Sequence, residues 1–250
     1  MKTLFLAWQD PENRNWLTVG RLTFENGEYK FVYTAGAHSS KKFRPFERMD
    51  DLYSSYVSKE LFPLFANRIL TKSRPEYSDF IKWLNITNEN ADTEFEMLAL
   101  TGGTRGTDSL EVFPCPEPDI TGKYHVKFFS HGLRHLPNES CERVKNLSIG
   151  DKLFAMLDVQ NPFDSFALVL RTGDPATIVG FAPRYLAQDF HAYLKNNPGL
   201  VEFNVSKVNP DAPAQMRLMC VMKAPWLSDY KPCSSEQYNP LSEVNTCPTR

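Results

Sequence analysis

The stretch from Phe128 to Ala187 constrains the fold of this chain more than any other part of the sequence. It contains a short apolar strand, a turn at Gly132, an Asn-Pro-Phe-Asp corner at 161–164, an apolar run at 167–170 and a Gly-Phe-Ala-Pro-Arg step before a helix. Proline has no backbone N–H, and Asn and Asp favour turns, so the corner must bend the chain between two strands. The apolar run that follows is typical of a strand in the core of a small β-barrel.

Three ordered blocks within this stretch carry a resemblance to a known family. They are Arg134 after a Gly-Leu step, the block QNPFDSFALVL, and the block VGFAPRYLA further along the chain. Their order and spacing resemble the HIRAN domain, an OB-like β-barrel found alone or attached to DNA-repair helicases, over roughly residues 124–206. The family is associated with binding single-stranded DNA at its free 3′ end, and the resemblance implies the same for this chain.

The resemblance also implies roles for individual residues. Asp164 matches the acceptor of a hydrogen bond from the terminal 3′ hydroxyl, and Phe163 matches the aromatic ring that stacks on the terminal base. His135 stands where family members often carry a second aromatic ring, and Arg134 would meet a phosphate oxygen. Each assignment has a structural alternative: Phe163 could belong to the core, Asp164 could cap the turn, and Arg134 could pair with an acidic neighbour.

Three further residues complete the expected nucleic-acid-binding set. Asn161 opens the Asn-Pro-Phe-Asp corner. Phe181 occupies a position where some DNA-binding family members use a polar residue that contacts phosphate. Arg184 lies three positions further along and could replace that contact, because an arginine side chain is a strong phosphate donor.

Two strand patterns open the chain, at 3–9 and 16–34. The second contains Glu25-Asn26-Gly27-Glu28, and an Asn-Gly pair between alternating apolar residues is a strong signal for a β-hairpin. The sequence therefore predicts a strand followed by a two-stranded hairpin, with a loop rich in Ser and Lys after it.

Three segments with the apolar spacing of helices follow, at 59–70, 75–86 and 93–103. The third ends at Gly102-Gly103, which is typical of a helix end because glycine adopts positive φ without strain. Residues 107–114 then return to a strand pattern.

This first half resembles the N-terminal subdomain of the HipA kinases, which precedes the kinase core and helps dock the DNA-binding partner. The matching blocks are VGRLTFENGEYKFVYTAGA, LFPLFANRIL and FEMLALTGGTRGTDSLEVFP, within residues 4–114. The resemblance implies an accessory or antitoxin-like subunit for a HipA-like serine/threonine kinase in a toxin–antitoxin or phage-defence system, with a helix-turn-helix protein as another partner. The apolar segment 61–70 is the expected docking surface.

The predicted fold class is α+β, with two domains and a tail. A small HipA N-terminal-subdomain-like α+β domain is expected at 1–119, an OB-like β-barrel of the HIRAN type at 120–227, and a loosely packed or frayed C-terminal tail at 228–250. The boundary is drawn at the prolines between Pro114 and Asp119, which are typical of a short, stiff linker. The part before Gly122 is mildly acidic and the part after it mildly basic, which favours different partners.

Composition argues against several classes of protein. The formal net charge is −2, which disfavours a protein that coats nucleic acid by charge alone. No stretch is long and apolar enough to span a membrane, and the opening MKTLFLAWQD turns polar too early for a signal peptide. The 5 cysteines form no CxxC pair and their number is odd, so reduced thiols in the cytoplasm are expected.

Two constellations suggest chemistry, and simpler explanations are favoured for both. Residues 101–106 are glycine-rich like a phosphate-binding loop, but they follow a helix and lack the Lys-Ser/Thr ending, so a helix end and a turn are expected. His125, His131, His135 and Cys141 are possible zinc ligands, but a Pro-Asn turn separates the cysteine from His131 and His135, which would share one face of a strand. Neither a kinase core nor any other catalytic signature appears, so the chain is expected not to be an enzyme and to use no cofactor or metal.

Two hypotheses about function remain open. The first is a non-catalytic protein whose residues 124–206 bind 3′ ends of single-stranded DNA. The second is an interaction protein whose residues 1–114 act on a kinase partner, and the two are compatible because different halves carry them. The alternative to DNA binding is a pure protein-interaction module.

Overall fold

A computed structural model of the chain describes residues 2–87, 93–161, 164–196, 198–227 and 231–242. The chain separates into two compact units, each with its own sheet and apolar core. The first unit comprises Met1–Tyr77, Asn88–Cys115 and Lys231–Arg250, and the second comprises Ser78–Thr87 and Pro116–Tyr230. Each unit is therefore assembled from segments that are separated in the sequence.

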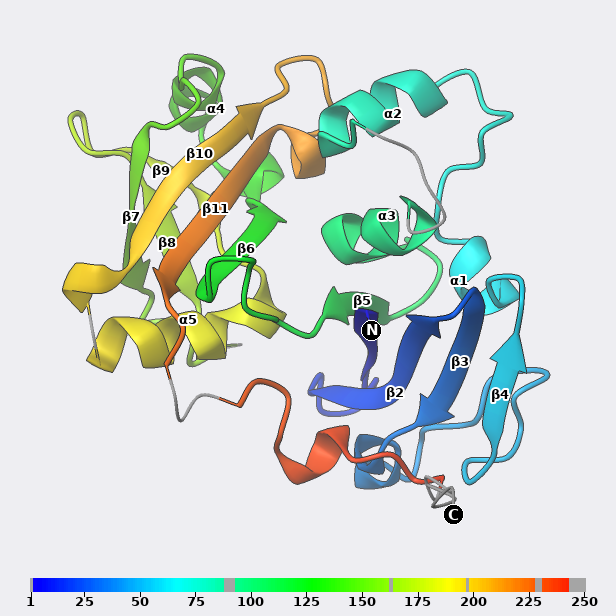
Figure 1. Cartoon of the computed structure of the whole chain (residues 1–250). Helices are drawn as coiled ribbons and strands as arrows, with labels where there is room; N and C mark the ends of the chain where they lie inside the picture. Colours follow the sequence, from blue (N-terminus) through cyan, green and yellow to red (C-terminus); the bar gives the residue numbers. More distant parts are fainter. Residues whose placement is uncertain (1, 88–92, 162–163, 197, 228–230, 243–250) are drawn as a thin grey trace. The chain divides into compact units, whose positions relative to one another are not determined.

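The first unit is built on an antiparallel sheet with the strand order β4-β3-β2-β1-β5 (Figure 1). Its strands are β1 (Lys2–Gln9), β2 (Trp16–Glu25), β3 (Glu28–Tyr33), β4 (Ser55–Ser58) and β5 (Leu110–Pro114). Its helices are α1 (Pro63–Ala66), α3 (Thr93–Thr101) and the 3-10 helices η1 (Ala35–Ser39) and η5 (Glu236–Tyr238). Leu4, Leu22 and Phe31 are register partners on one face of the sheet and pack there in a core with Phe65 and Leu98.

The hairpin predicted at Asn26-Gly27 is confirmed. β2 and β3 pair down to Glu25↔Glu28, and the two residues between them have φ values of 53° and 80°. Positive φ at both central residues is the mark of a type I′ turn, whose twist matches that of the flanking strands. This short turn therefore sets the register of the hairpin.

Of the helices predicted in the first half, one ends where the sequence predicts and another is much shorter than predicted. α3 ends at Thr101, and the N–H of Gly102 (φ 69°) donates to Leu98 O at 3.0 Å, as expected for a helix end. The helix predicted at 59–70 is a single turn, α1. Its apolar residues pack in the core of the unit, with Phe65 fully buried, and do not form one exposed helical stripe.

The C-terminal segment 231–242 also packs against the sheet of the first unit, and its Leu241 contacts the apolar core there. Leu241 N–H donates to Tyr33 O at 2.9 Å, and the Tyr238 ring packs edge-on against Phe5 with 4.8 Å between centroids. This segment was expected to be loosely packed or frayed, and it instead forms part of the first unit. A composition rich in Pro, Ser and Asn predicts irregular backbone, but it does not say whether that backbone packs.

The second unit is a curled sheet, or half-barrel, with the strand order β6-β11-β10-β7-β8-β9 (Figure 1). Its strands are β6 (Lys123–Phe129), β7 (Lys152–Leu157), β8 (Leu168–Arg171), β9 (Ile178–Phe181), β10 (Glu202–Val208) and β11 (Leu218–Pro225). Its other elements are α4 (Asn138–Lys145), α5 (Arg184–Asn196) and the 3-10 helices η2 (Leu133–His135), η3 (Pro198–Leu200) and η4 (Ala214–Met216).

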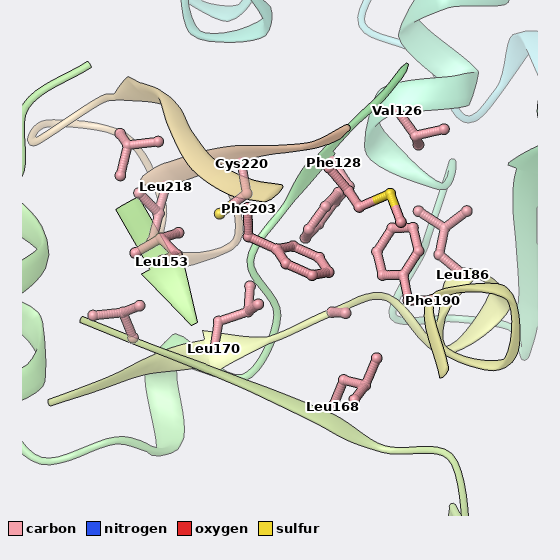
Figure 2. Packing of buried hydrophobic residues seen from close by; sticks show 14 of the residues in the cluster. Val126, Phe128, Leu153, Leu168, Leu170, Leu186, Phe190, Phe203, Leu218 and Cys220 are labelled. Carbon is pink, nitrogen blue, oxygen red and sulfur yellow. The ribbon is translucent and has the colours of Figure 1, made fainter. Parts of the chain in front are cut away.

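The inner face of the half-barrel holds its core (Figure 2). Phe128, Leu170 and Phe203 from three strands pack with Leu186 and Phe190, which α5 contributes. The chain is therefore a mixed α/β structure whose second sheet is curled around an apolar interior. No helix within the described residues is long and apolar enough to cross a membrane.

Most of helix α2 (Tyr77–Leu84) belongs to the second unit, although its sequence lies in the first half. Lys207 Nζ donates a hydrogen bond to Lys82 O, and Asn209 Nδ2 donates to Trp83 O at 3.0 Å. The last carbonyls of a helix have no partner within the helix, so these two donors cap its C-terminal end.

Removal of residues 231–250 is expected to destabilise the first unit. The deletion takes away backbone hydrogen bonds and exposes Phe5 and its neighbours, so the free energy of unfolding should fall by about 2–4 kcal/mol. Urea unfolding followed by circular dichroism measures the change. Removal of 243–250 alone is the control, because it leaves the contacts of Tyr238 and Leu241 in place; equal losses from the two deletions would contradict the role of this segment.

Candidate nucleic-acid interface

β9 and the segment after β6 come together at the open edge of the half-barrel. His131 N–H donates to Phe181 O and Phe181 N–H donates to His131 O, both at 2.9 Å. Ser130 adds a buried hydrogen bond, from its Oγ to Val179 O at 2.7 Å. Because β6 and β9 are the two ends of the strand order, this bridge partly closes the half-barrel.

The close approach of these two segments requires glycine at position 180. Gly180 has a φ of 122°, and a Cβ there would lie 1.9 Å from Ser130 Oγ and 2.7 Å from His131 O. Gly132 also has a positive φ, of 78°, and a Cβ there would lie 3.0 Å from Cδ2 of Phe181. The Phe181 ring therefore packs directly over the backbone of the turn at Gly132.

The turn at Gly132 leads into η2, which presents Arg134 and His135 to solvent. Arg134 Nε donates to His135 Nε2 at 2.9 Å, an arrangement that uses the neutral ring with its proton on Nδ1. Within the described residues no carboxylate pairs with Arg134. The arginine charge is therefore not neutralised there by an acidic neighbour.

The Asn-Pro-Phe-Asp corner is held by hydrogen bonds from its own side chains. Asp164 N–H donates to Asn161 Oδ1 at 3.1 Å, and Phe166 N–H donates to Asp164 Oδ1 at 2.9 Å. At the base of the loop, Asp158 N–H donates to Ala167 O at 2.8 Å. Asp164 therefore caps the turn through one carboxylate oxygen, as its structural alternative predicts.

The other carboxylate oxygen of Asp164 faces Arg184, the first residue of α5. Asp164 Oδ2 lies 3.7 Å from Arg184 Nε, and the two side chains are 18% and 39% exposed. That distance exceeds the roughly 2.7–2.9 Å of a charge-assisted hydrogen bond, and an ion pair of this exposure contributes only about 0–1 kcal/mol. This ion pair therefore holds the two groups together only weakly.

The predicted residues fall into two groups that meet where β9 turns into α5. The first group is Arg134, His135 and Phe181, and the second is Asn161, Asp164 and Arg184. Ala182 N–H donates to Leu168 O at 2.9 Å and fixes this turn. Phe163, the predicted stacking residue, lies outside the described residues.

Sequence reasoning missed a further cluster on the neighbouring strands. The Arg171 guanidinium lies over the Phe154 ring, 4.7 Å from its centroid, and Lys152 Nζ lies 5.3 Å from the same centroid. One sequence signal could have revealed this cluster. Residues of β7 alternate between the core and the outer side, and Lys152, Phe154 and Met156 lie on the outer side.

The possible metal ligands do not gather in the described part of the chain. No group of three His, Cys, Asp or Glu side chains there is arranged to hold a metal ion. Cys141 Sγ lies 3.9 Å from Leu133 O, and the cysteine is a free thiol. Burial raises the pKa of the Cys220 thiol, which keeps it protonated in the core of the second unit.

Substitution of Gly180 by alanine is expected to destabilise the second unit strongly. Backbone strain costs about 1–3 kcal/mol, and the clash with Ser130 adds a similar amount, so the free energy of unfolding should fall by about 2–6 kcal/mol. Thermal and urea unfolding measure the loss. Gly199→Ala is the matched control, because nothing lies within 4 Å of a Cβ at that position; a similar loss in both variants would contradict the steric argument.

Comparisons with known proteins bear on the same region. The family model of the HIRAN domain matches residues 123–224, which contain the bridge, the corner and both groups of predicted residues. Comparison with curated proteins gives no match. A solved structure of a Lactobacillus plantarum protein shows 16% identity over 41% of this chain and 97% of that chain, with a TM-score of 0.33. The HIRAN domain of human HLTF shows 16% identity over 42% of this chain and 80% of that chain, with a TM-score of 0.32.

The assignment of the second unit rests on the family model. That model begins at residue 123, and the resemblance of the first half to the HipA N-terminal subdomain therefore stays a prediction. The match supports a HIRAN domain at residues 123–224.

Proposed function

We propose that the second unit binds single-stranded DNA at a free 3′ end. The observation that carries the proposal is the arrangement of Asp164, whose Oδ1 is used by the turn while its Oδ2 lies 3.7 Å from Arg184. A carboxylate oxygen at the surface can accept a hydrogen bond from a hydroxyl, and the guanidinium beside it can bind a phosphate. The family match supports the proposal, because HIRAN domains are associated with DNA 3′ ends.

In the proposed complex, Asp164 Oδ2 accepts the hydrogen bond of the 3′ hydroxyl and Arg184 contacts the phosphate before the terminal nucleoside. A 3′-phosphate would bring its charge against the carboxylate and would bind less well. Phe163 stacks on the terminal base, which tolerates any base. Asn161 is a positioning residue, because its Oδ1 accepts the Asp164 N–H and so orients the carboxylate.

The group of Arg134, His135 and Phe181 gives the DNA strand a second contact. Arg134 carries a charge that no carboxylate among the described residues neutralises, and it binds a phosphate oxygen. His135 lies beside it and offers a ring for a neighbouring base. Phe181 is packed on Gly132 and forms an apolar wall, so the polar contact that some family members make at this position passes to Arg184.

The proposed activity is binding alone, without kinase, nuclease or ATPase activity. The sequence carries none of the signatures that position a nucleophile, a general base or a phosphate-bound metal. Purified full-length protein should therefore turn over neither ATP nor DNA when divalent metal ions are supplied. Metal-dependent turnover that a single carboxylate or histidine substitution abolishes would contradict this.

For the first unit we propose a protein-interaction role, as an accessory or antitoxin-like subunit of a HipA-like kinase with a helix-turn-helix partner. This proposal rests on the resemblance within residues 4–114. The docking surface expected at 61–70 does not fit the fold, because Leu61 and Phe65 are buried and their apolar neighbours pack against the core. Purification of the tagged chain from its native host, followed by mass spectrometry, tests whether a kinase accompanies it.

Asp164→Asn is the sharpest test of end recognition. The variant keeps an oxygen that can accept the Phe166 N–H and removes the charge, so the turn should survive. A hydrogen bond to a charged group contributes roughly 1.5–3 kcal/mol, so affinity for a 3′-hydroxyl oligonucleotide should fall about ten- to a hundredfold. Fluorescence anisotropy with matched 3′-hydroxyl and 3′-phosphate oligonucleotides measures both affinities, and the preference for hydroxyl should disappear.

Phe163→Ala is the matched comparison, because it removes stacking and leaves the carboxylate. The variant should bind both oligonucleotides more weakly by a similar factor, about five- to a hundredfold, and should keep the preference for the hydroxyl end. Equal affinities of the wild type for the two ends would refute end recognition. Binding of neither oligonucleotide would favour a pure protein-interaction module.

A further inference from the structure

A surface that combines aromatic, apolar and cationic side chains lies on the outer side of β7, β8 and β9. We call it the β7–β9 face, and it is formed by Lys152, Phe154, Met156, Arg171, Ile178 and Phe181. Strand pairing puts Phe154, Arg171 and Ile178 in one row across the three strands. Met156, Val169 and Phe181 form the next row, and paired residues share a face of the sheet.

The intervening residues of the same strands point the other way. Leu153, Leu168 and Leu170 lie in the core of the second unit (Figure 2). Successive side chains of a strand alternate between the two faces, so Lys152, Phe154 and Met156 lie outside. Met156 is 43% exposed and Ile178 is 40% exposed, so both side chains are partly open to solvent.

Among the described residues, no carboxylate neutralises the charges on this face. The Arg171 guanidinium lies 4.7 Å from the Phe154 centroid, its Nε lies 3.2 Å from Met156 Sδ, and Lys152 Nζ lies on the same ring at 5.3 Å. In the described residues neither cation forms an ion pair with a carboxylate. Aromatic rings beside unpaired cations are the chemistry that single-stranded nucleic acids use, through stacking and phosphate contacts.

A simpler explanation is that Arg171 only shields the Phe154 ring from water. Shielding alone does not account for a second cation, Lys152, at the same ring, or for the exposed Met156 and Ile178 around it. The face is also continuous with the candidate 3′-end site. Phe181 is the last residue of the row that begins at Met156, and it packs on the turn at Gly132 that precedes Arg134. Position and charge together therefore favour a ligand that extends away from that site.

We propose that the β7–β9 face is the track for the DNA strand on the 5′ side of the terminal nucleotide. This inference rests on the proposed function of the second unit. Arg171 and Lys152 bind successive phosphates, and the Phe154 ring with the guanidinium above it offers a stacking platform for a base. β7 is about 13 Å long from Met156 to Lys152, which leaves room for about two to four nucleotides beyond the terminal one.

The test is the dependence of affinity on oligonucleotide length. Full-length protein is titrated with 5′-labelled, 3′-hydroxyl oligo(dT) of two to eight nucleotides, and affinity should rise with length and level off at about four to six nucleotides. Arg171→Gln should lower affinity for the eight-nucleotide strand by about tenfold and reduce the slope of log K against log salt by about 0.7. Its affinity for the dinucleotide should stay within about twofold of the wild type, because that ligand does not reach the face.

Two further variants separate the track from general effects. Lys127→Gln removes one charge from an exposed position of β6, three places from β7 in the strand order, and should leave the length dependence unchanged. Phe154→Leu keeps an apolar side chain beneath Arg171 and removes the ring, so the affinity should rise less with oligonucleotide length. Thermal melting checks that this variant stays folded.

The outcomes distinguish the track from the end site. A preference for 3′-hydroxyl ends with no gain in affinity beyond the dinucleotide would overturn the track alone. Equal losses in Lys127→Gln and Arg171→Gln would also overturn it, since only bulk charge would then matter. A gain with length without any preference between 3′-hydroxyl and 3′-phosphate ends would support the track and contradict the end site, and no binding of any oligonucleotide would overturn both.

Discussion

The bridge between His131 and Phe181, with Gly180 beside it, is the constraint on which the second unit depends. It joins the two ends of the strand order and turns an open sheet into a half-barrel with an enclosed core. Each fully buried large apolar side chain in that core contributes roughly 1.5–3 kcal/mol, but only if the sheet curls far enough to cover it. Glycine is required at 180 because Ser130 Oγ occupies the place of a Cβ.

The same bridge positions the candidate chemistry. It sets Phe181 over the turn before Arg134, and the chain then passes directly into α5, where Arg184 faces Asp164. The proposed site therefore relies on a few well-placed charges on a chain of net charge −2, and not on a large positive field. Binding of that kind depends on geometry and stacking more than on counterion release, so its dependence on salt is expected to be shallow.

The two units exchange segments, which limits what a linear division of the chain can describe. α2 is capped by Lys207 and Asn209 of the second unit, while Leu241, near the end of the chain, hydrogen-bonds to Tyr33 of the first. The prolines between the halves indicate where the chain turns, and they carry no information on where segments far away in sequence will pack. For that reason the segments that build each unit could not be predicted from composition.

The sequence by itself determined the features that depend on neighbouring residues. Asn26-Gly27 specified the hairpin and Gly102 the end of α3, because backbone preferences of a few residues decide these. Only the tertiary structure decided the single turn of α1, the packing of 231–242 and the placement of Arg171 over Phe154. Contacts between segments distant in the sequence fix those features. The alternation of β7 indicates which of its side chains point outward, but not which residue of another strand packs on them.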